Sequence, residues 1–164
     1  MSTRKKRILF SSLAVTLTVI TWMLARAVQK HDGWILGKLS DEFAHDAPLG
    51  NVQVAVGGGA VSLRGSVALL EDKRQAVRKA TNTDHVRTVK DYVVVKTRWV
   101  PDGTLRMQLK HDLRSHELGG LRLKVRKGVV TVRGPIPSSR ERVLSLIAST
   151  EGVRDIKDRM TPAE

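Results

Sequence analysis

A basic residue stands at every second position of residues 121–126, and the positions between are all apolar. Successive side chains of a strand point to opposite faces, so apolar residues directed at a core leave the basic ones on the other face. Arg133, in the next predicted strand, points the same way as Thr131. Such a face can bind anionic lipid or another polyanion, or it can simply be solvated. The candidate lipid-binding residues are Arg122, Lys124, Arg126 and Arg133.

The chain offers no arrangement of residues typical of catalysis or of metal binding. No two of its five histidines are four residues apart, and there is no cysteine to supplement them. No serine lies in a G-x-S-x-G turn. The glycine run 57–59 is followed by a strand pattern, whereas a phosphate-binding loop requires a helix there. We therefore expect no enzyme activity, no metal site and no cofactor.

The net charge of +13 is distributed unevenly along the chain. Residues 98–164 carry fourteen basic and eight acidic residues, whereas residues 31–97 carry nine and eight. The first half of the folded chain is thus close to neutral. The second half, which contains the candidate basic face, is the half suited to an anionic partner.

Two stretches of seven residues, 59–65 and 128–134, begin and end with glycine and alternate apolar with polar residues. They lie 69 residues apart, and each follows another alternating segment. Two alternating segments around a tight glycine turn are typical of a β-hairpin, so the hairpin is repeated. The glycines that we expect to be structural are Gly59, Gly65, Gly128, Gly134 and Gly152.

Each hairpin is flanked by segments with helical spacing. Large apolar residues recur every four positions before it and share one helix face. These residues are Ile35, Leu39 and Phe43 in the first copy and Leu105, Leu109 and Leu113 in the second. A second helix is expected after each hairpin, and in the first copy Leu70, Val77 and Ala80 share a face of it. Each unit therefore reads helix, strand, strand, helix, strand.

This order of elements resembles that of the BON domain, a module of the bacterial envelope. The resemblance is carried by the glycine-bounded strands and by a Val-x-x-Val/Ile-x-Asp sequence at residues 86–91 and 153–158, and it covers residues 31–97 and 104–160. It implies an α+β fold of two small αββαβ units, which in this chain follow a segment predicted from its own residues to be an N-terminal membrane-targeting helix. Each unit would be a three-stranded mixed sheet with two helices on one face. The family's motifs are structural, and no catalytic residue comes with them.

Two features depart from the family's pattern. The family usually has glycine just before the last strand, where the second unit has Gly152 and the first has His85. It also tends to have asparagine where this chain has Asp91 and Asp158. Neither departure alters the hydrophobic pattern on which the fold depends.

The N-terminal segment is typical of an exported protein. Residues 1–30 hold six basic residues and no acidic one, and residues 8–25 carry no charge. This fits either a signal anchor or a signal peptide cleaved after Ala27. The expected location is therefore the inner membrane with both domains in the periplasm, or the periplasm after cleavage.

The predicted division of the chain has five parts. They are a signal anchor or signal peptide at 1–30, a first BON-like domain at 31–97, a linker at 98–103, a second BON-like domain at 104–160 and a tail at 161–164.

The resemblance implies a non-enzymatic envelope protein that associates with anionic phospholipid surfaces and supports envelope integrity or osmotic stress tolerance. The alternative is a protein-interaction scaffold that docks on an envelope partner. The expected partner is thus an anionic phospholipid membrane or an envelope protein. We expect no nucleic acid, because export separates the chain from it and only 4% of residues are aromatic and able to stack on bases. The sequence leaves the oligomeric state open.

Overall fold

The computed structural model describes residues 31–118, 120–135 and 140–161. The predicted membrane-targeting helix, the cleavage position after Ala27 and most of the C-terminal tail lie outside these residues. Within the described part, no helix is both long enough and apolar enough to cross a membrane.

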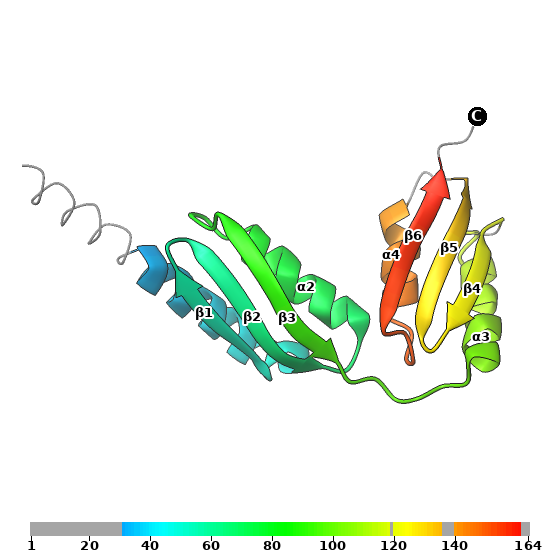
Figure 1. The fold of residues 1–164 in the computed structure, drawn as a ribbon, viewed down its shortest axis with the longest axis horizontal. Coiled ribbons are helices and arrows are strands. Elements are labelled where there is room, and N and C mark those ends of the chain that lie inside the picture. The colour runs from blue at the N-terminus through cyan, green and yellow to red at the C-terminus, as the bar shows by residue number, and fades with distance from the viewer. Residues whose placement is uncertain (1–30, 119, 136–139, 162–164) are drawn as a thin grey trace, which may run out of the picture.

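The chain folds into two units with the same order of elements, as the repeat predicts (Figure 1). The first helix is described over residues 31–44. The first unit continues with η1 (Ala47–Leu49), β1 (Val52–Gly57), β2 (Ala60–Val67), α2 (Leu70–Thr81) and β3 (Thr88–Val95). The second unit consists of α3 (Asp102–Ser115), β4 (Arg122–Arg126), β5 (Val129–Pro135), α4 (Arg140–Ala148) and β6 (Asp155–Thr161).

Each unit is built on a three-stranded mixed sheet. The strand orders are β1-β2-β3 and β4-β5-β6. The hairpin strands pair antiparallel, and the last strand pairs parallel with the second strand of the hairpin. The helices lie on one face of each sheet, so the other face is left without helices (Figure 1). The predicted α+β fold is thereby confirmed.

The residues spaced by four form the helix side of each core. In the first unit, Ile35 and Leu39 are fully buried and pack with Val61 and Leu63 of β2. In the second unit, the corresponding leucines of α3 pack against β4 and β5. Burying a large aliphatic side chain contributes about 1.5–3 kcal/mol, so these residues account for much of the stability of such small units.

An aspartate at the start of the first helix of each unit holds the hairpin turn. The two carboxylate oxygens of Asp32 accept hydrogen bonds from the N–H groups of Gly58 and Gly59, both at 2.8 Å. Asp102 binds the equivalent turn, with an oxygen 2.9 Å from the N–H nitrogen of Lys127. Asp32 and Asp102 therefore fix the hairpin turns of their two units. Because Asp102 begins α3, that helix starts within the segment expected to be linker.

The position before the last strand has positive φ in both units. Gly152 has φ 96° and His85 has φ 66°. In the second unit, a Cβ atom at Gly152 would lie 2.9 Å from the side chain of Val100. In the first unit the His85 ring instead lies beside the rings of His31 and Trp34, with centroids 4.4 and 6.0 Å away. Trp34 keeps 47% of its surface exposed.

Asp91 and Asp158 play the same part in their two units. Each accepts a hydrogen bond at 2.9 Å from the backbone N–H two residues further along its own strand. Each also pairs with a basic residue of the second helix: Asp91 with Lys73, and Asp158 with Arg140. The carboxylates thus tie the last strand to the helix. This accounts for aspartate at positions where the family tends to have asparagine.

The two units contact each other through α2, α4 and the segment that joins the units. Leu70, expected in the core of its own unit, belongs to the hydrophobic cluster of the second unit. Glu141 of α4 forms ion pairs with Arg74 and Arg78 of α2. The Thr97 hydroxyl accepts a hydrogen bond from the N–H of Gly152 at 2.8 Å. The contact therefore has an apolar centre and a charged rim.

Candidate functional site

The helix-free face of the second sheet carries the predicted basic residues. In the β4–β5 ladder, Arg122 lies opposite Arg133, and Lys124 lies opposite Thr131. Residues directly opposite each other share a face, so these side chains are all on one side of the sheet. Leu123 is only 8% exposed and points the other way, into the core. The basic face thus follows from strand alternation.

The third strand adds two basic residues that the sequence did not reveal as members of this face. β6 pairs parallel with β5 so that Lys157 lies opposite Thr131 and Arg159 lies opposite Arg133. Both side chains are exposed. The only sign of these two residues in the sequence is their alternate spacing within residues 155–161. That spacing places them on the basic face only when the parallel register with β5 is known. We call the complete set the basic face: Arg122, Lys124, Arg126, Arg133, Lys157 and Arg159.

Three arginines form one row across the basic face. Arg122, Arg133 and Arg159 are successive cross-strand neighbours, on strands that lie about 4.8 Å apart. Like charges directly opposite each other destabilise a sheet. Within the described part of the chain, none of the six basic-face residues forms an ion pair that would offset this repulsion. The arrangement is therefore suited to an anionic ligand that supplies the missing charge.

One acidic residue stands among the outward positions of these three strands. Asp155 lies opposite Val129 at one end of the sheet, away from the arginine row. Its carboxylate accepts a hydrogen bond from the N–H of Ile156 at 2.9 Å. This single acidic residue therefore leaves the basic face strongly positive.

The sequence model of the BON domain matches residues 31–97 and 101–163. The chain belongs to the BON domain family. No curated protein matches it.

Among solved structures, the chain is similar to two of CdsD, a structural protein of the type III secretion system of Chlamydia trachomatis. One is of its C-terminal domain, with 9% identity and a TM-score of 0.35 over 81% of this chain and 67% of that chain. The other has 11% identity and a TM-score of 0.35, over 81% of this chain and 65% of that one.

The first BON domain has a different outward face. Its exposed basic residues there are Arg64 of β2 and Lys90, which parallel pairing of β3 with β2 brings to the same side. The Arg64 guanidinium lies over the ring of Tyr92, 5.5 Å from its centroid. With six cations compared with two, the outward face of the second BON domain has the stronger positive potential.

A second basic group in the second BON domain lies on its helical side. Arg106, Lys110 and Arg114 of α3 are spaced by four and exposed. Because α3 covers the inner face of the sheet, this stripe lies on the helical side of the domain and is not part of the basic face. With three basic residues, it provides a control of the same charge as the row of Arg122, Arg133 and Arg159 within the same domain.

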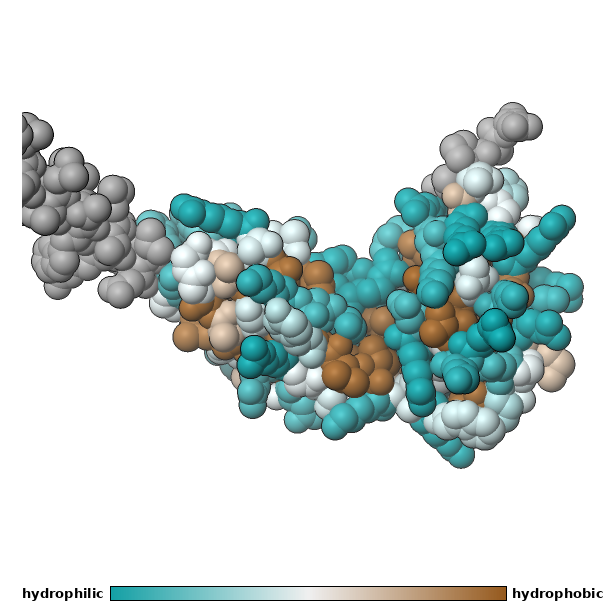
Figure 2. Space-filling model, in the orientation of Figure 1, coloured by the Kyte–Doolittle hydropathy of each residue, from teal (hydrophilic) through white to brown (hydrophobic). Residues whose placement is uncertain are grey.

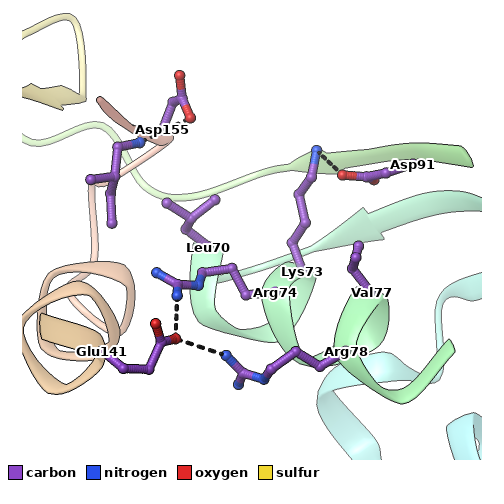
Figure 3. Close-up of a pocket in the computed structure, with 9 residues that line it drawn as sticks. Leu70, Lys73, Arg74, Val77, Arg78, Asp91, Glu141 and Asp155 are labelled. Carbon is purple, nitrogen blue, oxygen red and sulfur yellow. Dashed lines mark hydrogen bonds and ion pairs between the residues drawn. The ribbon is translucent and has the colours of Figure 1, made fainter. Parts of the chain in front are cut away.

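A cleft of about 440 Å³ lies where α2 of the first BON domain meets the second (Figure 3). Leu70, Val77 and Ile156 form its apolar lining. Most of its charged side chains form ion pairs with one another. Lys73 pairs with Asp91, and Glu141 pairs with both Arg74 and Arg78. Such internally paired groups favour a structural contact over acid–base chemistry. Across the described residues, no cluster of His, Cys, Asp and Glu could hold a metal ion.

Proposed function

We propose that this protein is a non-enzymatic module of the bacterial envelope whose second BON domain associates with anionic phospholipid surfaces through the basic face. The observation that carries the proposal is the unpaired row of Arg122, Arg133 and Arg159. Such a row destabilises the sheet by charge repulsion unless bound anions offset that repulsion. The exposed positions on neighbouring strands suit a broad, flat surface of phosphate groups.

The strength of the proposed association can be bounded. A basic residue close to an anionic leaflet contributes about 1 kcal/mol, and the effect decays within a Debye length of about 8–10 Å. Six residues on one flat face can all lie within that distance of a membrane. The contributions need not add fully, but the sum would hold a tethered domain at the surface and would weaken as salt rises.

The N-terminal segment supports a location of both BON domains on the periplasmic side of the inner membrane. Six basic residues and then an uncharged stretch precede the first BON domain, as in a signal anchor or a cleaved signal peptide. Either would present both BON domains to the periplasmic leaflet. Intact-mass measurement on membrane and periplasmic extracts would distinguish them, since the mature chain starts at Met1 in one case and at Val28 in the other. Support of envelope integrity or osmotic stress tolerance is the role that we propose in that place.

A scaffold that docks on an envelope protein is the second candidate. Met107 of α3 favours it, because this residue is 66% exposed between the basic side chains of the helical side. Methionine is enriched at protein–protein interfaces relative to the rest of the surface. A scaffold of this kind would not respond to lipid charge.

Vesicle flotation at increasing phosphatidylglycerol content tests the proposal. The fragment 28–164 is suitable, because the buried residues that form both described cores lie between Ile35 and Val153. We expect binding to rise with anionic lipid and to fall with salt. Replacing Arg122, Lys124 and Arg126 by glutamine should weaken it by about 3 kcal/mol, roughly a hundredfold at low salt. Binding that is independent of phosphatidylglycerol would favour the scaffold.

A further inference from the structure

The helix-free face of the first BON domain exposes two neighbouring apolar residues. Tyr92 and Val94 of β3 are 54% and 57% exposed, while Val93 between them is 3% exposed and faces the core. Both residues therefore point outward from the middle and end of the same strand. Their cross-strand neighbours are Arg64 and Ser66 of β2. The outward surface thus changes from basic to apolar towards the end of β3.

The two helix-free faces lie on the same side of the molecule. In Figure 1 both sheets are in front of their helices, and β3 ends beside the second BON domain. Figure 2 shows this side with an apolar patch near the end of β3, within a surface that is otherwise largely hydrophilic. A flat surface that meets the basic face can therefore also meet Tyr92 and Val94.

We infer that Tyr92 and Val94 enter the interfacial layer of the same anionic bilayer that the basic face contacts. The inference rests on the proposed function, and it assigns the first BON domain an apolar part in that binding. Tyrosine favours the level of the lipid headgroups, and Arg64 over its ring places a cation at the level of the phosphates. The apolar contact then adds to the electrostatic one.

The charges on the helix-free side disfavour a dimer in which a second copy of the chain covers this side. A symmetric dimer through the helix-free side would bring each copy's basic residues against those of the other. The outward strand positions of the first BON domain carry Arg64 and Lys90 and, over the described strands, no acidic residue. Like charges facing each other across a contact cost several kcal/mol. An anionic bilayer meets no such repulsion.

The test replaces both apolar residues without changing the charge. Tyr92→Thr/Val94→Thr keeps side chains that favour strands, and its melting temperature reports whether the fold persists. With fragment 28–164 and phosphatidylglycerol-containing vesicles, we expect about tenfold weaker binding. The binding that remains at high salt should fall furthest, because salt does not screen apolar contacts. Leu36→Ser is the control, since this apolar residue is exposed on the helical side, and it should bind like the unmodified fragment.

A second variant makes the inference independent of that double substitution. In Tyr92→Trp, brominated acyl chains should quench tryptophan emission more strongly than in the unmodified fragment, which retains Trp34 and Trp99. Equal quenching, or equal affinity of Tyr92→Thr/Val94→Thr and the unmodified fragment, would overturn the inference and leave the proposed function standing. Self-association of the unmodified fragment that the double substitution abolishes would show a dimer contact and also overturn it. Failure of the unmodified fragment to bind anionic vesicles would instead overturn the proposed function.

Discussion

At the scale of single residues, one glycine near the end of the second strand of each hairpin, Gly65 in β2 and Gly134 in β5, is under a different constraint in each unit. Gly65 has φ 129° and Gly134 has φ 136°, a region that L side chains rarely adopt. A Cβ atom on Gly65 would lie 2.1 Å from the backbone oxygen of Asn51. On Gly134 it would meet the end of the Leu121 side chain at 3.2 Å, and that side chain can move. A side chain would thus cause similar backbone strain at the two positions, but it would be more crowded at Gly65 than at Gly134.

We therefore predict that Gly65→Ala destabilises the protein more than Gly134→Ala. Backbone strain alone costs about 1–3 kcal/mol at either position. The clash with Asn51 should add to this cost at Gly65, because a backbone oxygen cannot yield as a leucine methyl can. Urea unfolding followed by circular dichroism would measure both. A smaller loss for Gly65→Ala than for Gly134→Ala would contradict this geometry of the two hairpins.

At the scale of the elements, the last strand of each unit is fastened through its own aspartate. Asp91 binds the N–H of Val93 and pairs with Lys73, whose ammonium also donates to the Val93 carbonyl oxygen at 2.7 Å. Backbone groups on the open edge of β3 are thereby occupied. Edge strands with free backbone groups invite pairing with other chains, so the device also protects this edge.

Substitutions at Asp91 should separate its two contacts. Asp91→Asn keeps an oxygen for the Val93 N–H and loses only an ion pair whose side chains are 27% and 29% exposed, so it should cost less than about 1 kcal/mol. Asp91→Ala loses both contacts and should cost about 1–3 kcal/mol. Thermal melting of the two variants would compare them, and similar losses would mean that the ion pair carries the effect.

Local patterns made the elements predictable, whereas non-local contacts did not. The spacing of Ile35 and Leu39 and the alternation of residues 121–126 depend on helix and strand geometry within a few residues. Lys157 and Arg159 reach the basic face only through parallel pairing with a strand more than twenty residues earlier. Leu70 has helical spacing that fits its own core, but it packs into the other unit. No short-range pattern contains such information.

At the scale of the whole molecule, the second BON domain carries two separate groups of basic residues. The basic face lies on the helix-free side, and the α3 stripe of Arg106, Lys110 and Arg114 lies on the helical side. Net charge alone would attract either side to an anionic membrane. Association through the basic face requires that the helix-free side dominates, and we expect this because six residues on a flat sheet can approach the surface together.

The most direct test compares two variants of equal net charge in fragment 28–164. One replaces Arg122, Arg133 and Arg159 by glutamine, and the other replaces Arg106, Lys110 and Arg114. With phosphatidylglycerol-containing vesicles at low salt, the first should lose about a hundredfold in affinity and the second less than about threefold. Equal losses in the two variants, or a greater loss from the α3 variant, would contradict the claim that the helix-free face of the second BON domain binds the membrane.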